Sequence, residues 1–221
     1  MKTTKLAMLS MMVLLLSMTA CKKNHTSKAG ATFSVKAKNL SALRMANTGT
    51  FNFTKAMLGL SKIKFKKEVG DNEMKYKFEG IYSFDILTGT CQPPLGVIEI
   101  DPGKYTKLKI KVDNVMPTGN SIEIEGTYTE NGTDYPFEFT STLDEDYEIE
   151  NPTGITVDAN QEIHFVLYLD LKSLFNGVNF STATVGNDGV IHINHNSNSQ
   201  LASIIENNFD DAMDFDDDSD D

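Results

Sequence analysis

Apolar and polar side chains alternate with a period of two residues along much of this chain, and this pattern restricts the fold more than any other feature. Between Lys107 and Val112, three lysines share one parity, while Leu108, Ile110 and Val112 share the other. Successive side chains of a β-strand point to opposite faces of its sheet. The segment is therefore predicted to be a strand with one solvated face and one buried face.

The same alternation predicts strands in most of the chain beyond residue 30. They are expected at residues 31–38, 50–54, 63–66, 74–84, 121–129, 135–143, 155–157 and 162–171. Asn131-Gly132 separates two of these strands and predicts a hairpin, because both residues accept the positive φ of a tight turn. Turn-forming residues at 70–72 and 186–189 predict two further hairpins, the last one between residues 180–185 and 190–194.

Residues 80–114 combine a strand, a loop, a short strand, a tight turn and a long strand, and we expect them to form the organising corner of the fold. The turn is Asp101-Pro102-Gly103, in which proline presets φ and glycine tolerates a positive φ. Cys91 lies in the loop. A lone thiol could pair between molecules, but we expect a partly buried, small apolar side chain.

The period becomes helical only near the C-terminus. Apolar residues at intervals of three and four, from Leu201 to Met213, predict an amphipathic helix over about 198–213, and Ser197 with Gln200 resembles a capping box. Residues 173–176 favour one helical turn. The acidic run that follows predicts a solvated, disordered tail over 214–221, because its like charges repel each other.

Short strands separated by turns, with one late helix, are typical of a mostly antiparallel β-sandwich. The apolar fraction of 40% is sufficient for a packed core. Neither a linker nor an internal repeat divides residues 31–213, so we expect one domain there.

The N-terminus has the three parts of an export signal. Residues 1–20 contain two lysines, an apolar run too short to span a membrane and a small-residue end. Met18-Thr19-Ala20-Cys21 resembles the lipobox of bacterial lipoproteins, in which the signal is cut before the cysteine and the cysteine is acylated. Met18 stands where leucine is usual. We therefore expect a lipid anchor at Cys21 and a flexible tether over 21–30.

Lys22 and Lys23 follow the cysteine, a pattern that resembles lipoproteins delivered to the outer membrane; the periplasmic or outer face stays open. The formal net charge is −11, and it becomes −13 when residues 1–20 are removed with their two lysines and no acid. An acidic protein of this kind is a poor partner for nucleic acid, which binds through Lys and Arg.

Several short motifs of the central region are similar to one known family. They are Phe84–Gly89 (FDILTG), Leu95-Gly96, Pro102–Thr106 (PGKYT), Leu60–Phe65, and Val157–Leu174 with its Leu169-Asp170-Leu171 run. Together they resemble the bacterial lipoprotein family catalogued as domain of unknown function 4382, over about two-thirds of the chain. The resemblance implies an immunoglobulin-like or transthyretin-like β-sandwich and an exported, surface-associated module without an assigned reaction.

Asp101–Tyr105 also resembles the tyrosine corner of immunoglobulin-like sandwiches, in which the tyrosine hydroxyl bonds to the chain a few residues upstream. The resemblance implies structural roles for Asp101, Gly103 and Tyr105. Lys107 stands where those domains have a bridging cysteine, so the pattern implies no inter-sheet disulfide.

Motifs of catalysis are missing from the sequence. Gly103-Lys104 lacks the other residues of a phosphate loop, and His192 and His195 are spaced to lie on opposite faces of a strand. The acidic residues are numerous enough for a glycosidase pair, but acids in turns and at strand ends are usually caps or solvated. The candidates are Asp85, Asp101, Asp113, Asp144, Glu145, Asp146 and Asp170.

We therefore expect a lipid-anchored β-sandwich of the outer membrane that works as a binding or adhesion module for a protein or glycan, without catalysis, cofactor or metal. The acidic tail lacks the glycine and distant glutamate of an EF-hand loop, so any calcium binding there would be weak. A carbohydrate-active or accessory enzyme that uses a carboxylate pair is the alternative. A purely structural envelope subunit is the third hypothesis.

Overall fold

The computed structural model describes residues 27–38, 43–44, 49–69 and 72–218, and it confirms the expected mostly β, antiparallel sandwich. The smaller sheet has the strand order β14 (Met213–Asp217), β12 (Glu162–Asp170), β1 (Ala29–Lys38), β7 (Ile98–Ile100). The larger sheet has the order β11 (Glu145–Val157), β8 (Gly103–Val112), β3 (Thr50–Val69), β9 (Ile122–Glu130), β10 (Thr133–Ser141), β13 (Ile191–Ile193). Beside this path lie β2 (Leu43–Arg44), β4 (Asn72–Phe78) and β5 (Tyr82–Asp85), which pair with β3, and β6 (Thr90–Gln92), which pairs with β5.

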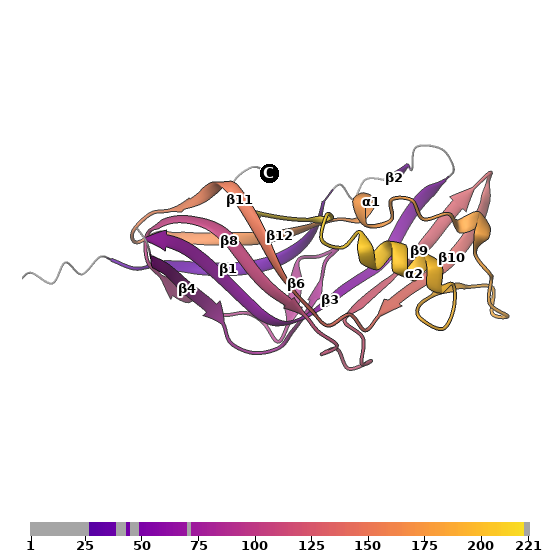
Figure 1. Ribbon diagram of the computed structural model, residues 1–221, viewed down its shortest axis with the longest axis horizontal. Coiled ribbons are helices and arrows are strands. Elements are labelled where there is room, and N and C mark those ends of the chain that lie inside the picture. Colours follow the sequence, from indigo (N-terminus) through magenta and orange to yellow (C-terminus); the bar gives the residue numbers. More distant parts are fainter. Residues whose placement is uncertain (1–26, 39–42, 45–48, 70–71, 219–221) are drawn as a thin grey trace, which may run out of the picture.

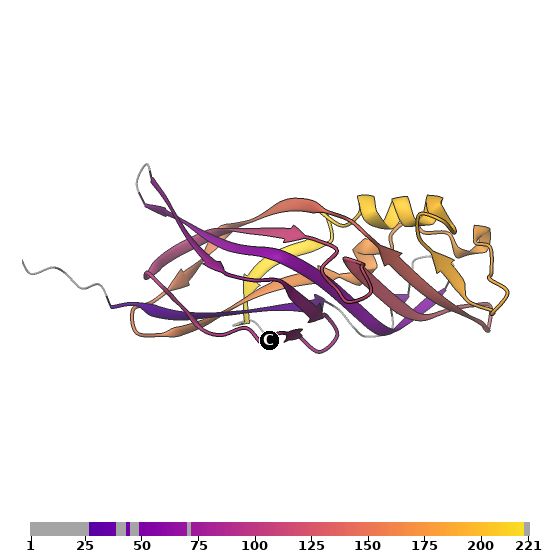
Figure 2. The ribbon, with the colours of Figure 1, turned by 90° about the horizontal axis from the view of Figure 1, so that it is seen from below.

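The strand β3 has 20 residues and runs from one half of the elongated molecule into the other (Figure 2). The two separate strands predicted at 50–54 and 63–66 are therefore wrong, because both belong to β3. Its Gly59 N–H donates to the Ser121 carbonyl at 2.8 Å, and its Gly59 carbonyl accepts from the Asp113 N–H at 3.1 Å. The N–H and the carbonyl of Gly59 point to the same edge of β3. β9 and β8 therefore pair with successive stretches of that edge, β9 before Gly59 and β8 after it.

Two β-bulges explain why β3 was not recognised as one strand. They lie after Phe53 and after Leu60, and each shifts the pairing with the neighbouring strand by one residue. Each bulge also shifts the parity of the buried side chains. Phe51, Leu58 and Phe65 are consequently all buried, although strict alternation would place Leu58 on the opposite face from the other two.

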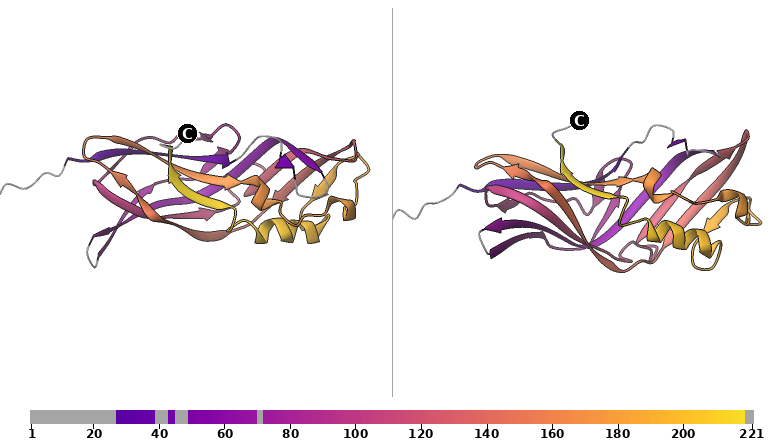
Figure 3. Two further views of the ribbon diagram at one scale, coloured as in Figure 1. Left: turned by 90° about the horizontal axis from the view of Figure 1, so that it is seen from above. Right: turned by 45° about the horizontal axis from the view of Figure 1, so that its top comes forward.

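The two halves of the larger sheet have different covers (Figures 1 and 3). In one half the smaller sheet packs on it, and Phe65 stacks on Phe165 with ring centroids 4.4 Å apart. In the other half the covers are α1 (Leu171–Leu174), the 3₁₀ turn η1 (Phe180–Thr182) and α2 (Ser199–Asn207). There Phe137 of β10 contacts Phe175 at 5.6 Å. One hydrophobic cluster includes both halves.

The predicted hairpin at Asn131-Gly132 is confirmed. These residues have φ values of 52° and 78°, and β9 and β10 pair in register on either side of them. β3 and β4 also pair as a hairpin; of the turn predicted at 70–72, residues 70–71 lie outside the described residues and Asn72 begins β4. The strand predicted over 74–84 is divided into β4 and β5.

The hairpin predicted over 180–194 is wrong. Residues 180–182 form η1, while β13 pairs in parallel with β10, with Ile191 opposite Phe137. Phe180 is buried and stacks on Tyr128 at 4.5 Å. This contact stabilises a turn of helix over β9 instead of a strand, and the apolar pattern of so short a segment fits both.

The helix predicted over 198–213 ends at Asn207 as α2, and the predicted capping box is not formed. Asn198 is the N-cap with φ 49°, and it has no side-chain hydrogen bond to the helix. Its side chain instead bonds to backbone groups of Thr184 and His192. Asn198 therefore holds the 183–198 segment together, a tertiary role that local pattern cannot reveal.

The acidic tail predicted over 214–221 is wrong in its first part, because residues 213–217 form β14 beside β12. Phe215 is fully buried and contacts Phe165 at 5.6 Å. Lys38 pairs with Asp214 at 2.9 Å, and Lys36 pairs with Asp218 at 2.6 Å. The buried ring of Phe215 and the positive charges of Lys36 and Lys38 together offset the repulsion among the acids.

The strand β11 is also longer than its predicted part, 155–157. It starts at Glu145 and contains a bulge between Glu150 and Ile155. Asn151 lies in this bulge, and its side-chain amide donates to the Phe215 carbonyl of β14 at 2.9 Å. The bulge thus joins the edges of the two sheets.

Cys21 and the predicted signal at 1–20 lie outside the described residues. The predicted tether, 21–30, overlaps the first strand, since β1 begins at Ala29. Among the described residues, none of the helices has the length and apolar character needed to cross a membrane.

Candidate functional site: a lysine-rich face

Eight lysines gather on the solvent side of the larger sheet, and we call this surface the lysine face. They are Lys62, Lys64 and Lys66 on β3, Lys75 and Lys77 on β4, and Lys107, Lys109 and Lys111 on β8. Side chains of a strand alternate between its two faces, so these lysines point to solvent while the intervening Phe65 and Leu108 point into the core. The outward alternation of these lysines was visible in the sequence, but their assembly on one surface was not.

Pairing between strands sets the lysines of the face directly opposite one another. Lys62 faces Lys111, Lys64 faces Lys109, and Lys66 faces Lys107 across the β3–β8 ladder. On its other edge, β3 sets Lys64 opposite Lys77 and Lys66 opposite Lys75. Like charges at directly opposite positions destabilise a sheet. A face built this way has a lower free energy when anions lie over it.

The strand β11 supplies some of these anions along one border of the face. Glu148 contacts three of these lysines: its carboxylate pairs with Lys66 at 2.8 Å, with Lys107 at 3.1 Å, and also with Lys109. The hydrogen bond from Lys109, followed by that from Lys66, lowers the pKa of Glu148 to about 2. The carboxylate is therefore ionised throughout the physiological pH range.

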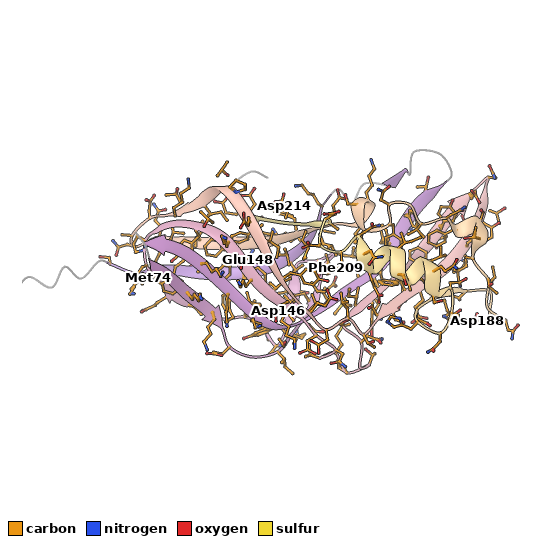
Figure 4. All side chains as sticks on the ribbon, viewed as in Figure 1. Met74, Asp146, Glu148, Asp188, Phe209 and Asp214 are labelled. Atoms are coloured by element: carbon orange, nitrogen blue, oxygen red, sulfur yellow. The ribbon has the colours of Figure 1, made fainter. Side chains whose placement is uncertain are left out.

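Further acids of β11 and its preceding turn complete the border. Asp146 pairs with Lys62, and this hydrogen bond lowers the pKa of Asp146. Asp144 pairs with Lys111 at 2.7 Å and raises the pKa of that lysine. We call Asp144, Asp146, Glu148 and Glu150 the acidic border. Figure 4 shows Asp146 and Glu148 on the half of the sheet that contains β8.

At the centre of the lysine face, acidic side chains neutralise only part of the positive charge. Within the part of the chain that the structure describes, Lys64 has no ion-pair partner. It lines a groove of about 370 Å³, whose walls are Lys62, Lys64, Lys66, Lys75, Lys109, Asp146, Tyr147 and Glu148. The described lining of this groove has five lysines and two acids, so its cations outnumber its anions by three, in a chain whose net charge is −11.

A second groove, of about 450 Å³, lies over the opposite end of the larger sheet. His192 lies at its rim, and its two ring nitrogens contact Asp188 at 2.9 Å and Glu138 at 3.1 Å. The hydrogen bond to Asp188 raises the pKa of His192. This clamp joins the 186–189 turn to β10, which is a structural role. His195, the other histidine considered, approaches Glu206 at 3.5 Å.

The three residues with implied structural roles meet at one corner. The Tyr105 hydroxyl donates to the Asp101 carbonyl at 2.7 Å, which is the hydrogen bond of a tyrosine corner. Lys28 contacts the Asp101 carboxylate at 2.5 Å and lowers the pKa of Asp101. Gly103 has φ 139°, and a Cβ there would lie 2.4 Å from Lys67. Burial raises the pKa of Tyr105.

Cys91 is a free, partly buried thiol that packs against the core, and burial raises its pKa. Among the acids considered as a catalytic pair, Asp85 accepts hydrogen bonds from the turn after β5, and Asp170 caps α1. The others have partners too. They are Asp101 and Asp146, described above, Asp113 and Asp144 near Lys111, and Glu145, which accepts from Tyr147.

One polar contact had no signal in the sequence, because its members come from strands far apart in the chain. Ser34 Oγ lies 2.8 Å from His164 Nε2, and Thr32 Oγ1 lies 2.8 Å from Nδ1. This is the spacing of a nucleophile and its base. Ser34 is only 5% exposed, so a substrate has no approach to it, and the contact links β1 to β12.

No family model, curated protein or solved structure matches this chain. Nor do the described residues contain a group of three or more His, Cys, Asp or Glu side chains suited to a metal ion. The lysine face is therefore the candidate site on physical grounds, as the surface with concentrated and partly uncompensated charge.

Proposed function

We propose that this protein is a lipid-anchored lipoprotein of the outer membrane that works as a binding module without catalysis, and that the lysine face contacts its ligand. The observation that carries the binding role is the groove around Lys64, where positive charge exceeds negative charge on a paired, rigid sheet. A rigid strand scaffold presents side chains to a ligand with little loss of conformational entropy on binding.

The anchor rests on the sequence around Cys21. An apolar run, small residues and the cysteine follow one another as in a lipobox, and the first strand begins eight residues further on, at Ala29. Several acyl chains on one residue would hold the protein firmly, since each buried methylene contributes about 0.8 kcal/mol. The short connection would keep the domain close to the membrane surface.

Metabolic labelling with a fatty acid tests the anchor. The wild-type protein should carry label and move with the membrane fraction, whereas Cys21→Ala should lose the label and Cys91→Ala should retain it. Equal label on wild type and Cys21→Ala would rule the anchor out. Protease treatment of intact cells then decides the face: removal of the domain places it outside, and full protection places it in the periplasm.

We also propose membership of the lipoprotein family catalogued as domain of unknown function 4382, with its immunoglobulin-like or transthyretin-like sandwich. The hydrogen bond from Tyr105 to Asp101 supports this assignment, because the tyrosine corner is typical of immunoglobulin-like sandwiches. An experimental structure of a family member tests it. A match in strand order, including the parallel pairing of β1 with β12, is expected.

A carbohydrate-active enzyme is the second candidate, and one observation favours it. Glu125 and Glu138 lie directly opposite each other on β9 and β10, and both line the second groove. Retaining glycosidases use two carboxyl groups about 5 Å apart. Release of reducing sugar from polysaccharides, lost in both Glu125→Gln and Glu138→Gln, would support this candidate; no release by the wild type would count against it.

A further inference from the structure

The spacing of the lysine face matches a particular kind of ligand. The Cα atoms of lysines two residues apart on β3 or β8 are separated by about 6.7 Å, and neighbouring strands lie about 4.8 Å apart. The result is a lattice of cations with short, regular steps. A flexible chain that carries one negative charge on each of its units can place its charges on successive lysines.

The acidic border restricts the shape of such a ligand. Glu148 and Glu150 run beside Lys107 and Lys109 along β11, so that the positive strip is bounded by negative charge on one side. A planar anionic membrane pressed on this face would meet the border and the strip together. The border acids Asp146 and Glu148 reach across β8 to Lys62 and Lys66 of β3. A single narrow chain that follows β3 and β4 over Lys64, Lys75 and Lys77 lies on the side of the face away from the border.

The groove also lacks the features that other partners require. The exposed large apolar side chains of the described residues are Ile81, Val97 and Val185, and none of them lines it. Protein partners and membrane insertion use such side chains. Single-stranded nucleic acid needs exposed aromatic rings for stacking, and Tyr147, the aromatic residue that lines the groove, packs its ring on Phe209 instead.

From these observations we propose that the lysine face binds a linear acidic polysaccharide, with Lys64 as the central contact. This inference rests on the proposed binding role of the face but not on the lipid anchor. Lys64 sits between Lys77 and Lys109 in the ladder and has no acid beside it among the described residues. An anionic sugar chain along β3 would supply the missing counter-charge.

Binding of the full-length protein, purified in neutral detergent, to polygalacturonate tests the proposal. Wild type should bind polygalacturonate but not neutral dextran. Lys64→Gln should bind about fivefold more weakly, since one exposed charge contact is worth at most about that factor. The slope of log affinity against log salt should fall by about 0.7 to 0.9 for the lysine removed.

Two further measurements separate a binding role from a structural one. Lys64→Gln removes repulsion and breaks no described ion pair, so it should unfold at the same temperature as wild type or higher. Lys172→Gln, at an exposed lysine of α1 outside the lysine face, is the control and should leave binding unchanged. A Lys64→Gln variant that binds as well as wild type would overturn the proposal.

The remaining outcomes distinguish the ligand from the site. If duplex DNA or phosphatidylglycerol vesicles bind more tightly than polygalacturonate, and Lys64→Gln weakens that binding, the polysaccharide is wrong while the lysine face remains the binding surface. If the wild type binds none of these probes, both the polysaccharide and the proposed role of the face are wrong. Fatty-acid labelling reports on the anchor independently.

Discussion

At the scale of single residues, Tyr105 should contribute measurably to stability. Its hydroxyl is fully buried and donates to the Asp101 carbonyl at 2.7 Å. Tyr105→Phe keeps the ring but leaves that carbonyl without its partner, so the free energy of unfolding should fall by about 1–2 kcal/mol. Chemical denaturation measures it. Tyr135→Phe is the control, because the Tyr135 hydroxyl has no partner among the described residues; an equal loss in both variants would contradict the assigned role.

His192 should make stability depend on pH. Its pKa is raised by the hydrogen bond to Asp188, so its contribution is complete below the unfolded pKa of about 6.5 and is lost as pH rises through the folded pKa. His192→Gln should therefore cost about 0.5 kcal/mol near pH 5.5, where solvent screens the pairs, and less near pH 8.5. Hydrogen exchange in the 186–189 turn checks this locally. A larger loss at pH 8.5 than at pH 5.5 would contradict it.

At the scale of elements, Glu148 ties β11 to β8 and β3. Its pKa is lowered to about 2, so its stabilising effect is present above the unfolded pKa of about 4.5 and is lost as pH falls toward 2. Glu148→Gln should lower the free energy of unfolding by about 1 kcal/mol at pH 7, after allowance for solvent screening, and by much less at pH 2.5. Denaturant titrations at both pH values measure this, with Glu150→Gln as a control at the same border.

The elements also show what local pattern predicts and what it does not. The Asn131-Gly132 hairpin follows from sequence because all its determinants lie within a few residues. The parallel partner of β13 and the burial of Phe215 depend on strands far away in the chain. For the candidate site, the outward lysines of β3 and β8 were predictable. Their register was not, because the bulge after Leu60 shifts the pairing.

At the scale of the whole molecule, β3 and the continuous core should make both halves unfold together. Phe51 lies in the helix-covered half and Phe65 in the two-sheet half, and one hydrophobic cluster contains both. Replacing either with alanine should cost about 3–5 kcal/mol, since each change removes a buried ring and leaves a cavity. Because the halves share β3, each substitution should reduce hydrogen-exchange protection equally in β10 and β12.

Exchange measured by mass spectrometry under native conditions, together with thermal unfolding, tests this coupling. Ile81→Ala, at a side chain that is 55% exposed, is the control and should change stability by less than about 0.5 kcal/mol. Two thermal transitions, or a loss of protection confined to the half that carries the substitution, would show that the halves unfold separately. A single shared transition would mean that a substitution in the helix-covered half also destabilises the lysine face, because Lys62, Lys64 and Lys66 lie on β3, which both halves share.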